Sequence, residues 1–290
     1  MTITGAVELL ATWEAGLAEA PSGRALLLHR TARPDVDVAS LPVLPVGERE
    51  ADLFALRRAL FGERMQVRLA CSACGEDMEF DLDAGEFARS LGGRGGSGDG
   101  QGGSTGGQGG SVGGRDSSAG AASSAGSASS VGTASFAGSA SSAGAVVRVR
   151  QDGWDVVFRL PGVADLTAAA RAADPRAALL ARCLVSAVRD GTDAGPGDLP
   201  VPVQRRIAEA VEAADPGADV TLNIACPECG EATRAELDIA SYLWTELDTW
   251  ARDLLLDVHL LATSYGWSEP EILALSPLRR RYYLELCADV

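Results

Sequence analysis

Apolar residues recur every three or four positions near the C-terminus, in the pattern of a long amphipathic helix. From residue 239 to residue 265 the pattern has no interruption, and it predicts a single helix of about 25 residues. The residues that carry it are Ile239, Leu243, Leu247, Trp250, Leu254, Val258, Leu261 and Tyr265.

The same spacing predicts shorter helices elsewhere. Near the N-terminus, the apolar stripe of one such helix stops before Pro21. Its residues are Val7, Leu10, Trp13 and Leu17. Further helices are expected over 24–30, 48–60, 174–189 and 203–214.

Two more helices are expected after the long one. Ser268 and Glu271 have the spacing of a capping box, which predicts a short helix through Leu275. Pro277 suits the first turn of a final helix. We expect these two helices to pack through Leu273, Leu275, Leu278, Tyr282 and Leu286.

Alternation with a period of two, which is typical of strands, occurs over 147–149 and 154–158. Asp152 and Gly153 lie between these stretches and favour a tight turn. The sequence therefore predicts a β-hairpin here.

Alternation also precedes two nearly identical phrases, QVRLACSACG at 66–75 and TLNIACPECG at 221–230. Each C-x-x-C pair is followed by Gly and Glu, and then by a second strand-like stretch. A C-x-x-C turn directs both sulfurs to one point, and glycine tolerates the positive φ of such a turn. The repeat predicts a zinc ribbon in which one Zn²⁺ with a structural role is held by Cys71, Cys74, Cys226 and Cys229.

Three alternatives to this zinc site stay open. The cysteines could bind nothing, they could form redox pairs, or each pair could belong to a separate intermolecular site. A site saturated by four thiolates has no open coordination position, so it favours a structural role over catalysis.

The segment from 92 to 145 is rich in Gly, Ser and Ala and has few large apolar residues. Such a composition cannot offset the entropy of ordering, so we expect a disordered insertion, with a partner-binding tether as the alternative. The whole chain is then a discontinuous α+β domain, mostly helical. Its predicted parts are an N-terminal helical part (1–64), a first zinc knuckle (65–91), the disordered linker (92–145), a β-hairpin with helices (146–219), a second zinc knuckle (220–237) and a C-terminal long helix with a helical pair (238–290).

The formal net charge of −15, with no lysine among the 290 residues, argues against a general nucleic-acid binder, because an acidic protein repels phosphate backbones. The N-terminal residues carry Glu8 and Glu14 and lack the basic start of a secretory signal. No apolar run approaches the length of a membrane span. We expect a cytoplasmic protein, in which cysteine pairs favour metal over disulfide.

The remaining candidates for chemistry are few. Cys183 lies among apolar residues and is expected in the core, Cys287 has no assigned role, and His259 falls within the long helix beside its apolar stripe. His29 is the other histidine, and no nucleophile–histidine–carboxylate pattern is recognisable. We therefore expect that the protein is not an enzyme.

The two C-terminal helices also have the order of a helix-turn-helix, in which Arg279, Arg280 and Arg281 would contact phosphates. The acidic charge of the chain favours the alternative, a pair of helices that pack on each other, with solvated or ion-paired arginines.

With these features in place, the sequence resembles the baseplate hub assembly chaperone family of T4-like phages and related contractile injection systems. The resemblance rests on C-x-x-C-G, C-P-x-C-G and the segment from DIASYLWTELDTW to YGWSEPEILALSPLRRRYYLEL, and it extends to LLATWEAGLAEAPSGRALLLHR and GWDVVFRLP. It implies a non-enzymatic assembly factor whose partners are baseplate or hub proteins of a contractile particle. The long Gly/Ser-rich insertion departs from the family.

Two alternatives to this assembly role remain, a structural baseplate subunit of the same particle and a zinc-ribbon transcription regulator. For an assembly factor, we expect partner contacts through aromatic residues and arginines of the C-terminal part, because these residue types dominate interface energetics. The candidates are Trp244, Trp250, Trp267, Arg279, Arg280, Tyr282 and Tyr283.

Overall fold

Three consecutive helices near the N-terminus and one helix near the C-terminus build the largest core of the computed structural model, which describes residues 5–87 and 145–288. These helices are α1 (Ala6–Leu17), α2 (Pro21–Ala32), α3 (Val46–Phe61) and α8 (Ile239–Tyr265). The predicted long helix is confirmed, since α8 has 27 residues. Asp238 caps its N-terminus by accepting from the Ser241 N–H at 3.1 Å, and Gly266 ends it with a φ of +69°.

The stripe predicted for α1 is only half right. Leu10 and Trp13 are buried, but Val7 and Leu17 are 62% and 46% exposed. Gly16 is buried instead, because the ring of Trp244 on α8 lies directly against it and leaves no room for a side chain. The close approach of the two helices at Gly16 therefore sets the rotation of α1.

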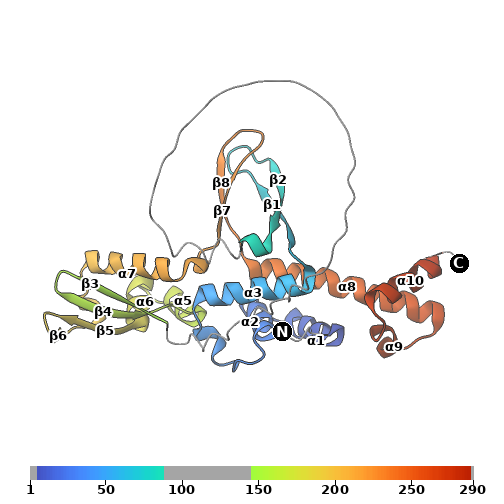
Figure 1. Ribbon diagram of the computed structural model, residues 1–290, viewed down its shortest axis with the longest axis horizontal. Coiled ribbons are helices and arrows are strands. Elements are labelled where there is room, and N and C mark those ends of the chain that lie inside the picture. The colour runs from blue at the N-terminus through green and yellow to red at the C-terminus, as the bar shows by residue number, and fades with distance from the viewer. Residues whose placement is uncertain (1–4, 88–144, 289–290) are drawn as a thin grey trace, which may run out of the picture. The chain divides into compact units, whose positions relative to one another are not determined.

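A second, smaller core lies under an antiparallel sheet in the order β3-β4-β5-β6. Figure 1 shows α7 running along this sheet, with α5 and α6 nearby. The predicted hairpin is confirmed, with Gln151 paired to Trp154 across the turn. The elements are β3 (Val146–Gln151), β4 (Trp154–Arg159), α5 (Val163–Ala170), α6 (Pro175–Cys183), β5 (Leu184–Arg189), β6 (Thr192–Asp193) and α7 (Val201–Ala214).

The helix predicted over 174–189 is wrong in its second half. The helix ends at Cys183, and β5 follows at once and pairs with β4. Tertiary pairing decides this, because LVSAVR carries β-branched residues that suit a half-buried strand. An Asp-Gly turn at Asp190 and Gly191, with φ of +47° and +84°, then leads into β6.

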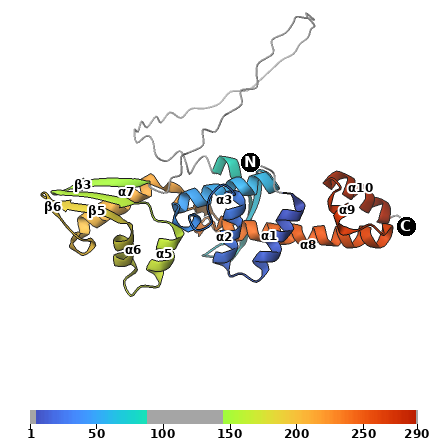
Figure 2. The ribbon, with the colours of Figure 1, turned by 90° about the horizontal axis from the view of Figure 1, so that it is seen from below.

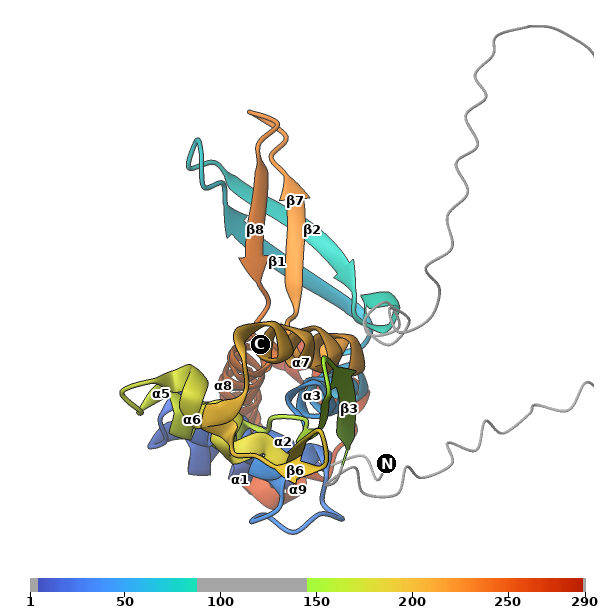
Figure 3. The same ribbon diagram turned by 90° about the vertical axis from the view of Figure 1, so that its left-hand side faces the viewer.

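Two further hairpins carry the cysteine pairs, and the strands predicted around each pair are confirmed. Each hairpin is a separate two-stranded sheet, and no ladder joins them. Figures 1 and 3 show them side by side above the helices. Their strands are β1 (Arg64–Ala70), β2 (Asp77–Asp83), β7 (Thr221–Ala225) and β8 (Ala232–Glu236).

Two helices end the chain, α9 (Glu269–Leu273) and α10 (Pro277–Ala288), and both contact α8. Figure 2 shows them at its C-terminal end. The predicted capping box at Ser268 is confirmed. The predicted packing face of α10 is wrong, since the side chains of Leu278, Tyr282 and Leu286 are 66%, 61% and 57% exposed.

The opposite face of α10 turns inward because of an ion pair. Arg280 is only 9% exposed and donates to Asp257 of α8 at 3.1 Å. Tyr283 lies edge-on to Tyr265 and Trp267, which stack with centroids 4.7 Å apart. The face of α10 with the strongest apolar pattern is therefore left at the surface.

The described residues on both sides of the Gly/Ser-rich segment belong to one compact unit, and the fold is α+β and mostly helical, as predicted. The predicted disordered linker lies outside the described residues, except for its last residue. Among the described helices, none combines the length and the hydropathy that crossing a bilayer requires.

Candidate metal centre

Each cysteine pair sits in a turn whose geometry is fixed by its own residues. In the first turn, Cys71 N–H donates to the carbonyl of Glu76 at 2.8 Å, and Gly75 N–H donates to the carbonyl of Cys71 at 2.9 Å. The second turn, residues 226–231, repeats both bonds at the same lengths. Gly75 and Gly230 have φ of +76° and +75°, which favours glycine at both positions. The repeated phrase therefore forms the same knuckle twice.

The two knuckles meet at their cysteines, and the four sulfur atoms all lie within 4.8 Å of one another. The Cys71 and Cys229 sulfurs are 3.6 Å apart, and those of Cys74 and Cys226 are 3.7 Å apart. In a tetrahedral thiolate site with metal–sulfur bonds of about 2.3 Å, neighbouring sulfurs are about 3.8 Å apart. The cluster therefore has the dimensions of a four-cysteine metal site, and the predicted ligand residues are brought together.

The thiols differ in their acidity. The backbone N–H groups of Cys74 and Ala73, which point at the sulfur, lower the pKa of Cys71 to about 6. For Cys74, the Glu76 N–H lowers the pKa, but the neighbouring thiol of Cys71 and desolvation outweigh it and raise the pKa to about 12. Anionic sulfurs this close repel one another, so full ionisation of the cluster needs a cation at its centre.

Very little apolar packing accompanies the cysteines. Cys71, Cys226 and Met78 are the buried residues of this small cluster, and Leu69 and Ile224 pack against it. Cys74 and Cys229, one from each knuckle, are exposed. Contact between the two knuckles therefore depends mainly on the sulfur cluster.

Thr233 supports the cluster and is missing from the sequence-based prediction. Its side chain is buried, and its hydroxyl donates to the sulfur of Cys71 at 3.8 Å. It also lies 3.5 Å from the Ser72 N–H of the opposite hairpin. A buried threonine next to a metal ligand orients that ligand and stabilises its thiolate. Its position on the strand after the second knuckle gives no sequence signal for this contact.

A buried arginine anchors the first hairpin to the helical core. Arg57 on α3 is 2% exposed and binds both carboxylate oxygens of Glu246 on α8, at 2.7 and 2.9 Å. It also donates to the carbonyls of Gly62 and Arg64, where β1 begins, at 2.7 and 2.6 Å. The base of the first hairpin is therefore fixed by the core, and its cysteine-bearing end depends on the sulfur cluster.

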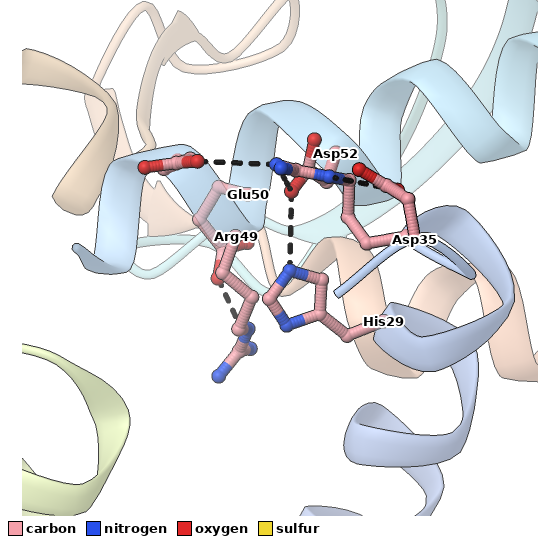
Figure 4. A network of polar contacts seen from close by, with 7 residues as sticks. His29, Asp35, Arg49, Glu50 and Asp52 are labelled. Atoms are coloured by element: carbon pink, nitrogen blue, oxygen red, sulfur yellow. Dashed lines mark hydrogen bonds and ion pairs between the residues drawn. The ribbon is translucent and has the colours of Figure 1, made fainter. Parts of the chain in front are cut away.

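A second polar cluster lies between α2 and α3 and involves His29 (Figure 4). His29 Nε2 lies 3.1 Å from Asp52, whose carboxylate also accepts from Arg33 at 3.1 Å. His29 is 1% exposed, and this bond joins the two helices. The other histidine, His259, is exposed on α8. Cys183 is buried in the core under the sheet, as predicted.

The structure places the predicted partner-binding residues in different environments. Trp244 is 8% exposed, with Arg24 stacked over its ring at 4.8 Å, and it belongs to the helical core. Arg280 is 9% exposed and bound to Asp257. The others retain surface, and they are Trp250, Trp267, Arg279, Tyr282 and Tyr283.

The chain matches no known protein family, no curated protein and no solved structure. The fold is therefore α+β, and its four clustered cysteines could hold a metal ion. The resemblance to baseplate hub assembly chaperones stays a prediction.

Proposed function

We propose that the four cysteines hold Zn²⁺ and that the ion has a structural role. The support is the ligand set, because four thiolates whose sulfurs all lie within 4.8 Å of one another suit Zn²⁺ and can fill its coordination sphere. A filled sphere leaves no position for water or substrate. The metal would therefore join two hairpins that come from distant parts of the chain.

Metal analysis of the purified protein tests this assignment. We expect one zinc per chain, which Cys226→Ser removes. Cys287→Ser is the matched control, since Cys287 lies on α10 and does not belong to the cluster. Iron in place of zinc, or zinc that survives Cys226→Ser, would contradict the proposal.

We infer that the protein is a non-enzymatic assembly factor for the baseplate or hub of a contractile injection system or phage tail-like particle. One observation carries this inference beyond the resemblance. Leu278, Tyr282 and Leu286 form a continuous row on α10, four residues apart, and all three are more than half exposed. An exposed apolar row of this kind is typical of a protein–protein contact. It lies within the segment on which the resemblance mainly depends.

The arginines of α10 give the regulator alternative little support. Arg280 is buried against Asp257, and Arg281 pairs with Glu285 on its own helix at 3.1 Å. Arg279 is left as the exposed arginine of the predicted triplet without an ion pair among the described residues. Binding to phosphates needs several free cations on one face, so protein binding is favoured.

The decisive experiment isolates the tagged protein from cells that make the particle, and compares this sample with finished particles by mass spectrometry. For an assembly factor, we expect baseplate or hub proteins to co-purify and the chain to be absent from finished particles. Stoichiometric presence in the particle would instead identify a structural subunit. The absence of any particle protein would refute both.

A matched pair of variants links this result to α10. Leu278→Asp together with Leu286→Asp should abolish co-purification and leave the metal content unchanged. The exposed pair Val185→Asp and Val201→Asp, 60% exposed on β5 and α7, is the control.

A further inference from the structure

A groove of about 870 Å³ runs along α8, beside the first hairpin and the C-terminal end of β8. One side consists of residues from β1, and α8 forms the floor. Two neighbouring rows of α8 residues, each with a spacing of four, face into it. The first row is Ser241, Thr245, Thr249, Asp253 and Asp257, and the second is Tyr242, Glu246, Trp250 and Leu254.

The spacing of these rows suits a second helix. Ridges with a spacing of four are those into which another α-helix packs most often. From residue 241 to residue 257 the rows extend about 24 Å, at about 1.5 Å per residue, which is the length of a helix of about 16 residues. The groove is therefore long enough for about four helical turns.

The floor of the groove allows a close approach. Ser241, Thr245 and Thr249 are exposed, and their side chains are short. The hydroxyls of Thr245 and Thr249 donate to carbonyls one turn earlier at 3.0 Å, and that of Ser241 donates to Asp238 at 2.6 Å. Because these protons already have acceptors, an occupant need not supply hydrogen bonds to them.

Apolar side chains flank this row and offer contact area. Trp250 and Phe61 are half-buried at the groove, and Val67 and Leu69 of β1 line its side. Half-buried aromatic residues at the centre of a groove contribute strongly when a partner covers them. Trp250 is one of the residues for which the sequence predicted a partner contact.

The charged residues that line the groove determine whether a basic or an acidic occupant is favoured. Carboxylates lie at both ends, Glu236 and Asp238 at one and Asp253 and Asp257 at the other. The two arginines of the lining are already used, since Arg68 pairs with Glu79 at 3.2 Å and Arg280 pairs with Asp257. Within the described part of the chain, Glu236 and Asp253 have no ion-pair partner. The uncompensated charge is therefore negative at both ends.

We propose that this groove binds a basic amphipathic α-helix of a partner protein. The occupant carries small apolar residues on one face and Lys or Arg near both ends, about four turns apart. The proposal rests on the proposed function, since it names the chemistry of a segment that an assembly factor would hold. It adds a second contact surface, separate from the exposed row on α10.

A second groove, of about 1030 Å³, offers an internal comparison. It lies between α7 and the α5–α6 pair, and its lining mixes both signs of charge, since it includes Arg176 and Arg205 as well as Glu209 and Glu212. This lining therefore favours neither a basic nor an acidic partner. Glu212 is exposed and serves as the control position.

The test is a selection from a displayed library of 16-residue helical peptides, with randomised residues at both ends and on one apolar face. We expect the peptides that bind the full chain to be enriched in Lys and Arg at both ends. Their affinity, measured by fluorescence anisotropy, should fall more than about tenfold with Thr249→Arg, which fills the floor and adds a positive charge that repels a basic occupant. Glu236→Gln with Asp253→Asn should weaken it about threefold to tenfold, and Glu212→Gln should not change it.

Three results would overturn the proposal: no peptide above background, selected peptides without basic ends, or affinity insensitive to Thr249→Arg. The result is independent of the particle experiment. If baseplate proteins co-purify but the selection fails, the groove proposal is refuted and the proposed function stands. If basic peptides bind in the groove but no particle protein co-purifies, the proposed function is refuted and the groove proposal stands.

Discussion

The cysteine-bearing ends of the two hairpins and the four-helix core are stabilised in different ways. The core buries nineteen residues in one cluster, drawn from four helices and the bases of the hairpins. The cluster at the hairpin ends buries three, of which two are metal-ligand candidates. Stabilisation by the hydrophobic effect is proportional to the apolar area that is buried. We therefore expect the core to be stable without metal, and the contact between the hairpin ends to need it.

The difference also separates two kinds of long-range contact. In the core, contact between distant segments is spread over many side chains, and the loss of one leaves the others. At the hairpin ends, no backbone ladder joins the two sheets, so contact depends mainly on four sulfurs, one threonine and a small apolar cluster around Met78. Loss of one cysteine should therefore disturb the whole contact between the hairpin ends. Loss of one core side chain should leave the other core contacts in place.

The largest expected effect is the loss of a ligand. Cys71→Ser and Cys226→Ser should remove bound metal equally, because each cysteine completes the same site. The effect should be large, since binding of structural zinc contributes on the order of 10 kcal/mol to the folding of small domains. Hydrogen exchange should then speed up at residues 64–83 and 221–236 and stay slow along α8. Unequal losses would indicate two separate sites, and faster exchange throughout α8 would show that the core also depends on the metal.

The second largest effect is expected for a core substitution, which should lower the stability of the protein and leave its metal content unchanged. Leu247 on α8 is fully buried, so Leu247→Ala should lower the free energy of unfolding by about 4 kcal/mol through lost burial and a cavity. Metal content should stay at one ion per chain in the folded protein. Leu256→Ala, on the same helix but 55% exposed, is the control and should cost less than about 0.5 kcal/mol in chemical denaturation.

A third substitution acts where the two regions join. Arg57→Ala leaves the Glu246 carboxylate and two backbone carbonyls without their donor, which should cost about 3 kcal/mol in denaturation. Hydrogen exchange should also rise at the base of β1, near Gln66. The matched change Arg58→Ala, at an exposed ion pair with Glu63, should have an effect within about 1 kcal/mol. Similar losses from both would mean that burial adds nothing to the Arg57 contact.

The smallest effect tests the support of the ligand. Thr233→Val keeps the shape of the side chain and removes the hydroxyl that donates to the Cys71 sulfur, so metal affinity should fall about tenfold. Competition with a chromophoric chelator measures it. Thr221→Val, on the paired strand with its hydroxyl bonded to Asp219, should leave the affinity unchanged. An equal loss in both variants would assign the effect to the strand and not to the sulfur.

Much of the local structure could be predicted because it depends on neighbouring residues. The two knuckles need only a C-x-x-C-G phrase, whose glycine adopts positive φ and whose backbone closes its own hydrogen bonds. The long helix α8 needs only an apolar repeat that exceeds the length of any strand. The Asp152-Gly153 hairpin follows from the same kind of local rule, and Asp190-Gly191 could have been found by it.

Where prediction failed, residues far apart in the sequence decide the outcome. Leu184–Arg189 is a strand because β4 offers it an edge, and the preceding helical pattern does not reveal that edge. The rotation of α10 is set by Arg280 and Asp257, which outweigh its apolar pattern and leave Leu278, Tyr282 and Leu286 exposed.

The sequence by itself determined the secondary structure of the knuckles and of α8, and which four cysteines could share a metal, since these depend on short-range geometry and ligand chemistry. Only the tertiary structure decided that the sulfurs meet within 4.8 Å of one another and that the hydroxyl of Thr233 donates to one of them. It also decided that Arg57 is buried, and which side chains remain at the surface to bind a partner. The physical reason is that burial and hydrogen bonding depend on which distant segments pack together, and no local pattern encodes that.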